Sequence, residues 1–424
     1  MYGLQKRKIK MLKGTFFKST MTLISGSVIT QVLAICISPI MTRLYTENQI
    51  GEYTLILTAV TMFGSVICGR YDMSIVSAPS EKKMYALIKL SFSLTVILSA
   101  IVSIGYALYY SYLNEISMSF FQTSIWLFIL LNFTGIGYIL ISYNNRNQDY
   151  KLMTSVNVIR EFGKDIILVI LGYFQVGTIG LLISQCAGVC LGLNRQAKKL
   201  KGKIKDIQKC TIYDMMDVAI EYKNQLIFSV PASFANSFSY SVLNIFVSNM
   251  YGLDMLGYYS MSFRMLGAPL SLVSANISKV FFERAAHEYN KKKNFRNIFI
   301  QTTGLLMFAA IPITLILMFF SPFLFELFFG VGWARAGEFV RYLAPMFGIR
   351  LVVSALSPAI IVCNKQKIEL LLQALFFIAS LGVYSICRGR YGIDIFLSLI
   401  SLLYSIIYII YYFVMLKFSK DKEL

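Results

Sequence analysis

Long apolar stretches recur along the whole chain, and they constrain its fold more than any other feature. A helix that crosses a bilayer needs about 20 mostly apolar residues. Twelve stretches of the 424-residue sequence approach or exceed that length. They are residues 18–41, 52–76, 84–110, 119–142, 152–173, 176–194, 224–249, 255–280, 297–320, 337–363, 368–387 and 392–416. The sequence therefore predicts an all-α integral membrane protein with 12 transmembrane helices.

The charged residues support this class and exclude others. Only 14% of residues are charged, against about 25% in soluble domains. The net charge of +19 would suggest nucleic acid in a soluble protein, but here Lys and Arg lie in short patches between apolar stretches. No nucleic-acid partner is expected. The seven cysteines are scattered and His287 is the only histidine, so neither a metal site, a cofactor site nor a His-based triad is predicted.

The distribution of Lys and Arg predicts the orientation. With a cytoplasmic N-terminus, the inner connections hold 31 of these residues and the outer connections hold 5. Cytoplasmic loops carry the excess of positive charge in membrane proteins, so both termini are predicted to face the cytoplasm. The run from Ser19 to Ile40 is too long for a cleaved signal peptide and is predicted to be a retained first span.

The segment from Ser27 to Tyr53 is repeated 206 positions later. Identical pairs are Ser27 and Ser233, Tyr45 and Tyr251, Gly51 and Gly257, and Tyr53 and Tyr259; similar pairs are Gln31 and Ser237, and Ser38 and Asn244. We interpret this as an internal duplication. Because each copy holds six spans, the halves enter the membrane from the same side and should form two six-helix pseudo-repeats, related by a twofold along the membrane normal.

The duplication predicts three parts. They are an N-terminal half (1–194), a basic cytoplasmic linker (195–223) and a C-terminal half (224–424). The lysines of the linker suit the anionic inner leaflet, although a loop that only sets topology explains them equally well.

The fifth predicted span contains an unusual set of charges. Arg160, Glu161, Lys164 and Asp165 lie within it, and ionisable groups inside a membrane usually face a cavity or a partner. Glu161 and Lys164 are spaced to pair on one helix face. Two interpretations stay open: this face lines a cavity, or the pair is a self-neutralised structural contact.

Two further arginines, Arg264 and Arg350, are predicted near mid-membrane, without an acidic neighbour in the local sequence. An uncompensated buried guanidinium is costly, so each should meet a distant carboxylate, water or an anionic ligand. Arg70 and Asp72 end the second predicted span, and Arg43 begins the first external turn; all three could equally be interfacial or capping residues.

The interior charges lean positive, which favours a negative passenger, and guanidinium groups suit phosphate. The candidate substrate-binding residues are Arg264, Arg350, Arg160, Lys164, Arg70 and Arg43. The candidate sites for a coupling proton or Na⁺ are Glu161, Asp165 and Asp72.

Three sequence segments together resemble a known family. Ser38-Pro39-Ile40-Met41-Thr42-Arg43-Leu44-Tyr45 is followed by Ile50-Gly51-Glu52-Tyr53 and then Arg70-Tyr71-Asp72. This order is similar to the polysaccharide transporter family, the bacterial O-antigen and capsule-repeat flippases of the multidrug/oligosaccharidyl-lipid/polysaccharide exporter superfamily. The resemblance implies a V-shaped alternating-access transporter. Its implied substrate is an oligosaccharide linked to undecaprenyl pyrophosphate, moved to the periplasmic leaflet for lipopolysaccharide or capsule biosynthesis. A polysaccharide polymerase is then a candidate partner, and a monomer is expected.

Other functions are less favoured by the sequence. A multidrug/cation antiporter of the same superfamily would use unpaired carboxylates, whereas the acidic residues here accompany basic ones. A membrane polymerase or ligase would need a sizeable external loop with catalytic groups; the longest predicted external connection is about Ser321 to Gly337, so no enzyme is predicted. A purely structural protein would not explain the costly arginines.

Overall fold

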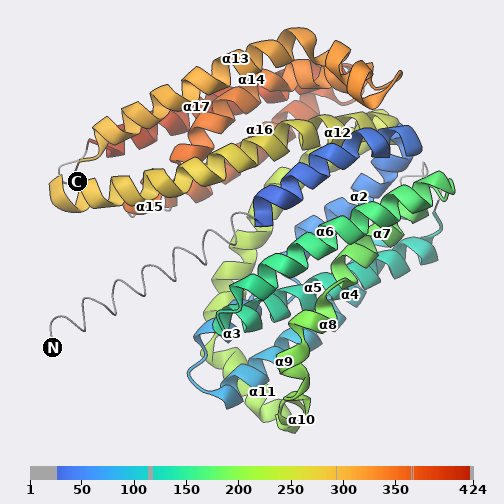
Figure 1. Ribbon diagram of the computed structural model, residues 1–424, viewed down its shortest axis with the longest axis vertical. Helices are drawn as coiled ribbons and strands as arrows, with labels where there is room; N and C mark the ends of the chain where they lie inside the picture. The colour runs from blue at the N-terminus through green and yellow to red at the C-terminus, as the bar shows by residue number, and fades with distance from the viewer. Residues whose placement is uncertain (1–25, 113–117, 293, 364, 366, 421–424) are drawn as a thin grey trace. The chain divides into compact units, whose positions relative to one another are not determined.

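The computed structural model describes residues 26–112, 118–292, 294–363, 365 and 367–420 (Figure 1). The start of the first predicted span and both chain termini lie outside the described residues. In the described part, all regular secondary structure is helical, which confirms the all-α class. The chain forms two compact units. Unit 1 comprises residues up to Ile37 and Ile56–Ser237, and unit 2 comprises Ser38–Leu55 and Phe238–Leu424.

Seven helices of the described residues are long and apolar enough to cross a membrane. They are Gly26–Leu44, Glu81–Tyr112, Phe120–Arg146, Ser241–Tyr289, Arg296–Phe329, Ala334–Val362 and Ile393–Phe418. Each coincides with one or two of the predicted spans. These helices identify a multi-pass membrane protein, as the apolar stretches predict.

The second predicted span is not one continuous helix, so the prediction over 52–76 is wrong in this respect. The chain instead forms α2 (Glu47–Gly64) and α3 (Tyr71–Ser77) with a turn between them. Gly69 and Arg70 both have a φ of 61° there. A right-handed helix cannot continue through this left-handed conformation, which glycine adopts easily and arginine adopts at a cost.

Unit 1 is built from pairs of packed helices. Helix α4 (Glu81–Tyr112) packs against α5 (Phe120–Arg146), and α6 (Tyr150–Tyr173) packs against α7 (Thr178–Cys190). A Cβ added to Gly135 of α5 would overlap the side chain of Thr95 of α4. Glycine at this position therefore lets the two helices approach closely.

The predicted linker folds into short helices that belong to unit 1. They are α8 (Leu193–Gln196), α9 (Lys198–Lys201), α10 (Ile204–Lys209) and α11 (Ile212–Glu221). The π-helix η1 (Gln225–Ser229) follows them, within the seventh predicted span. Helices α10 and α11 pack against α4. The Tyr71 hydroxyl donates a hydrogen bond to the carbonyl of Ala219 at 3.2 Å. The basic linker is thus folded onto unit 1.

The helices of the C-terminal part are α12 (Val230–Lys292), α13 (Arg296–Phe329), α14 (Ala334–Leu356), α15 (Pro358–Val362), α16 (Lys367–Cys387) and α17 (Ile393–Phe418). In unit 2, α14 packs against α13 and α17, and α16 packs against α17 (Figure 1). The backbone of α12 breaks at Gly252, which has φ 84° and ψ 178°. The break falls between the seventh and eighth predicted spans.

Unit 2 also contains a reciprocal contact between the two copies of the repeated segment. A Cβ added to Gly51 would overlap the carbonyl oxygen of Leu253, and one added to Gly257 would overlap the carbonyl oxygen of Glu47. Glu47 and Leu253 are themselves 206 positions apart. In the same place, Asn48 Nδ2 donates to Asp254 Oδ1 at 2.6 Å, again across 206 positions. Each glycine therefore packs against the residue equivalent to the one that its own copy supplies to the other glycine.

Candidate functional site

Helix α6 presents two different faces. Large apolar side chains are exposed along one face, at Ile159, Phe162, Ile166 and Ile170. Their spacing of three and four residues places them in one stripe, as expected for a surface that meets lipid. The polar residues Asn157, Arg160, Glu161 and Lys164 form a second stripe. This division lets one helix serve both lipid and a polar interior.

The polar stripe of α6 lines a cavity of about 410 Å³ within unit 1. The walls come from helix Gly26–Leu44, α5, α6 and α7. Lining residues are Gly26, Ser27, Thr30, Thr134, Gly137, Tyr138, Ile141, Thr154, Asn157, Arg160, Glu161, Lys164, Gln185, Gly188 and Val189. The cavity has the volume of a small-molecule site, with polar groups gathered among apolar helices.

Arg160 is held in place by neutral oxygen atoms. Its Nε donates to the carbonyl of Leu191 at 2.9 Å, and its Nη2 donates to Oε1 of Gln196 at 3.2 Å. Gln196 is fully buried, and its own carbonyl accepts a hydrogen bond from Asn144 at 3.1 Å. These contacts fix the orientation of the guanidinium without cancelling its charge. Arg160 can therefore attract an anion into the cavity.

Lys164 and Glu161 form an ion pair at the cavity wall. The Lys164 ammonium also lies 4.0 Å from Oδ1 of Asp165, which is buried. A Cβ added to Gly188 of α7 would lie 2.9 Å from the Cβ of Lys164, so glycine there makes room for the lysine. Cavity lining and structural pairing are the two interpretations of these charges. The structure shows both features, because Glu161 and Lys164 form a pair and both line the cavity.

Arg70 and Asp72 lie near the cavity without lining it. Asp72 is 5% exposed, in the first turn of α3. Both charges act on Tyr138, a lining residue. The left-handed backbone of Arg70 is an unfavourable conformation, which in proteins gathers at functional sites. Neither Arg70 nor Asp72 is therefore placed at the cavity surface.

Arg350 occupies a very different site in unit 2. Its guanidinium lies 5.4 Å from the centroid of the Phe347 ring and 5.9 Å from that of Phe263. The adjoining space is only about 20 Å³ and is bounded by residues that include Gln373 and Tyr404. Aromatic faces attract cations, so these rings offset part of the cost of the half-buried charge.

Arg264 and Arg43 also belong to unit 2. Arg264 is half-buried and approaches the sulfur of Met41 at 3.6 Å through Nη1. Arg43 is exposed near the end of helix Gly26–Leu44.

Several lining residues escape prediction from sequence. Thr134, Gly137 and Tyr138 of α5 and Gln185 of α7 line the cavity. A polar glutamine inside an apolar span was a usable signal, since such residues rarely face lipid. Gly137 gave no such signal in the sequence, because a glycine that borders a cavity cannot be told from a glycine that packs two helices together.

A family comparison follows this geometry. The model of a family described as "Polysaccharide biosynthesis protein" matches residues 88–338, more than half of the chain. The chain belongs to this family. The region includes α5, α6 and α7, which supply most of the cavity wall. No curated protein matches the chain by sequence.

Solved structures reveal what fold the chain shares. A structure titled "Lipid II flippase MurJ, inward closed conformation" has a TM-score of 0.71 at 17% identity, covering 94% of this chain and 90% of that one. An inward-facing multidrug resistance MATE transporter of the MOP superfamily gives 0.61 at 12% identity, covering 92% and 97%. A MOP superfamily transporter from Pyrococcus furiosus gives 0.57 at 12% identity, covering 94% of each chain. That transporter is described as having a binding pocket of reversed polarity, which suggests a different function for it.

These comparisons confirm the resemblance seen in the sequence. The family match and the fold of a lipid flippase and of MATE transporters agree with membership of the polysaccharide transporter group. The three structures named above are a flippase and two transporters, which agrees with the prediction that this chain is not an enzyme.

Proposed function

We propose that this protein is a flippase for an oligosaccharide linked to undecaprenyl pyrophosphate, an O-antigen or capsule repeat unit. It would move this lipid from the cytoplasmic to the periplasmic leaflet of a bacterial inner membrane. The observation that carries the proposal is the unit 1 cavity, in which the charge of Arg160 is held by neutral partners. Guanidinium groups bind phosphate oxygens through two parallel hydrogen bonds.

The chemical groups of such a substrate match the side chains that line the cavity. The pyrophosphate would meet Arg160 and Lys164, while hydroxyl and amide groups such as those of Thr154 and Gln185 would hydrogen-bond to sugar. The prenyl chain would stay in the bilayer. Arg264, Arg70 and Arg43 remain further proposed contacts and Arg350 a minor one, and none of the four lines the unit 1 cavity. Glu161, Asp165 and Asp72 remain proposed coupling sites.

We also propose that the fold consists of 12 transmembrane helices in two six-helix repeats that alternate between inward-open and outward-open states. The proposed halves, 1–194 and 224–424, follow the duplication and differ from the two compact units, since residues 38–55 belong to unit 2. The reciprocal contact of Gly51 and Gly257 supports the repeat. Pseudosymmetry predicts that Gly51→Ala and Gly257→Ala each lower the free energy of unfolding by a similar amount, about 1–3 kcal/mol. Markedly unequal losses would argue against the repeat.

A multidrug/cation antiporter is the second candidate, because MATE transporters share the fold and Glu161 lies in the cavity. The engagement of Glu161 with Lys164 favours the flippase, since a carboxylate bound to lysine is less available to a cation.

Reconstitution in liposomes separates the two candidates. A fluorescent oligosaccharide on a polyprenyl pyrophosphate is incorporated in both leaflets, and dithionite is added outside. Flipping exposes the inner pool, so quenching should approach completion with the wild type and remain near half with Arg160→Ala. Quenching near half with the wild type, together with proton- or Na⁺-driven export of a cationic dye, would establish the antiporter instead.

A further inference from the structure

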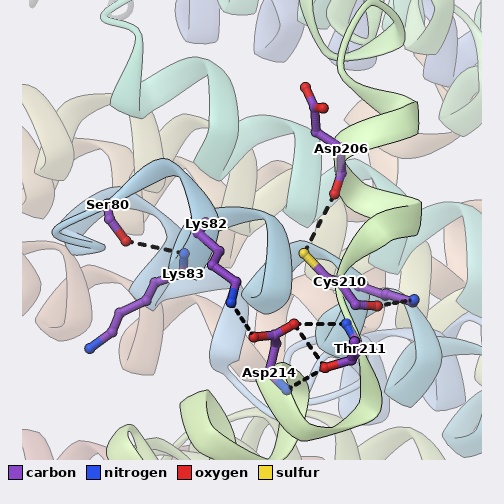
Figure 2. A network of polar contacts seen from close by, with 8 residues as sticks. Ser80, Lys82, Lys83, Asp206, Cys210, Thr211 and Asp214 are labelled. Carbon is purple, nitrogen blue, oxygen red and sulfur yellow. Dashed lines mark hydrogen bonds and ion pairs between the residues drawn. The ribbon is translucent and has the colours of Figure 1, made fainter.

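Helix α11 is fastened to unit 1 along one of its faces. Val218 is 2% exposed in the core beneath the helix. On the flank, Asp214 pairs with Lys82 at 2.7 Å and Glu221 pairs with Lys83 at 2.6 Å. Figure 2 shows the Asp214 carboxylate between Lys82 and Thr211. The acidic side of α11 is therefore directed at the first turn of α4.

The start of α11 is fixed as well. Thr211 and Asp214 form a capping box, in which each side chain accepts a hydrogen bond from the other's backbone. The Lys89 ammonium donates to the carbonyls of Cys210 at 2.6 Å and Gln208 at 3.2 Å. The hydrogen bond from Lys82, with those from Thr211, lowers the pKa of Asp214 to about 2. The helix is thus held in one rotational setting.

The opposite face of α11 is apolar and exposed. Ile212 is 72% exposed, Tyr213 84%, Met216 57% and Ile220 65%. Their spacing at i, i+1, i+4 and i+8 places them on one face of the helix. Four large apolar side chains so exposed on a ten-residue helix are costly in water.

The position of α11 along α4 sets its depth relative to the bilayer. Helix α4 is long and apolar enough to cross a membrane, and its exposed apolar residues begin at Phe92 and continue through Ile97 and Ile101. Lys89, which holds the chain just before α11, precedes Phe92 by about 4.5 Å of helix rise. The start of α11 therefore lies about one helical turn from the level at which α4 begins to meet lipid, and its far end, where Glu221 pairs with Lys83, lies about 14 Å of helix rise from that level.

The segment before α11 supplies positive charge at this level. Residues 195–209 contain seven Lys or Arg and one Asp. Lys203 and Lys205 are exposed, and α10, which holds Lys205, packs on α4 beside α11. Basic residues at a membrane surface attract anionic lipids. The apolar face of α11 suits the acyl chains at the membrane surface, and the neighbouring lysines suit the lipid phosphates above them.

We propose that α11 is an interfacial helix that inserts Ile212, Tyr213, Met216 and Ile220 between anionic phospholipids, with Lys203 and Lys205 binding their phosphates. The exposed Leu226, Ile227 and Phe228 that follow continue this surface toward α12. The site is independent of what the protein transports. It makes the connection between the proposed halves a lipid-bound element.

Tryptophan quenching in nanodiscs tests the proposal with the full chain. Tyr213→Trp places a reporter on the apolar face, and the parent protein supplies the emission of Trp126 and Trp333, which is subtracted. Brominated phosphatidylcholine should quench the reporter, and brominated phosphatidylglycerol should quench it at a lower mole fraction. Lys203→Gln and Lys205→Gln in the reporter background should each reduce this preference by about fivefold.

Lys151→Gln is the matched control, because Lys151 is an exposed lysine in the first turn of α6; it should leave the preference unchanged. A reporter with red-shifted emission that neither lipid quenches would overturn the proposal. So would a blue-shifted reporter that resists quenching, since another protein surface, such as a second copy of the chain, would then cover the face. Equal quenching by both lipids would remove the anionic phospholipid as the occupant.

Discussion

Arg160 and Arg350 are both candidate substrate-binding residues in the sequence, and they occupy opposite environments in the structure. Arg160 borders a cavity of about 410 Å³, with its guanidinium held by Leu191 and Gln196. Arg350 borders about 20 Å³, with its guanidinium near two phenylalanine rings. The first leaves room for a ligand oxygen, while the second replaces the ligand with aromatic faces. A buried arginine alone is therefore a poor sign of an anion site; the space beside it is the better sign.

Among the variants that test this contrast, removal of the Arg160 side chain should have the largest effect on lipid flipping. Arg160→Ala should lower the initial rate of lipid flipping by about 10- to 100-fold, the equivalent of hydrogen bonds to a charged group. Arg160→Lys keeps the charge but loses the fork and should be intermediate. The dithionite assay in liposomes measures both, with protein abundance in the membrane as the control. Wild-type flipping by the alanine variant would break the contrast.

A second test fills the cavity without touching a charge. Gly137 borders the cavity, and a Cβ added there meets no atom within 4 Å. Gly137→Leu should preserve abundance and reduce flipping several-fold, because the side chain takes the substrate's space.

The control for this test is Gly135, two residues earlier on α5, where a Cβ would overlap Thr95. Gly135→Leu should lower abundance, since overpacking a helix interface costs about 1–3 kcal/mol. Equal losses of abundance in the two variants would mean that Gly137 is also a packing residue.

Breaking the Lys164–Glu161 pair should act mainly on stability. Lys164→Met leaves Glu161 without its cation and should lower the free energy of unfolding by about 1–3 kcal/mol, the cost of an unsatisfied buried group. Adding Glu161→Gln should restore much of the loss. Thermal unfolding in detergent measures both variants. If the double variant is as unstable as the single one, the pair is not the reason for the loss.

Arg350 should give a smaller effect of another kind. Arg350→Gln removes the attraction to the rings of Phe263 and Phe347, which costs about 1 kcal/mol of stability, with little change in head-group binding. A loss of binding larger than that of Arg160→Gln would reverse the contrast between the two sites.

The smallest expected effect comes from the exposed pair of Lys82 and Asp214. The pKa of Asp214 is lowered to about 2 in the folded protein, below the value of about 3.9 in an unfolded chain. The pair thus stabilises the fold at pH above about 4, and the contribution is lost as the pH falls toward 2. Asp214→Asn should lower the melting temperature slightly at pH 7. A difference from the wild type that persists unchanged at the lowest pH would point to another cause.

Sequence reasoning succeeded where periodicity or spacing carries the information. The apolar stretches located the helices, and the spacing of Glu161 and Lys164 predicted their pairing on one helix face, which lines the cavity. It failed where long-range packing decides. The contact of Arg350 with the Phe263 ring and the open space at Gly137 depend on segments far apart in the chain, and the left-handed backbone at Arg70 has no local signal in the sequence. The folding of the basic linker onto α4 was likewise hidden, because its partners Lys82 and Lys83 lie more than 100 residues earlier.

Direct binding of a head-group analogue tests the central claim most simply. A short-chain polyprenyl pyrophosphate is titrated by calorimetry into the purified wild type and into the Arg160→Gln and Arg350→Gln variants. Binding by the wild type and by Arg350→Gln, with at least a tenfold weaker Kd for Arg160→Gln, is the predicted result. Equal affinity of the wild type and Arg160→Gln would contradict the account, because the unit 1 cavity would then not be the anion site.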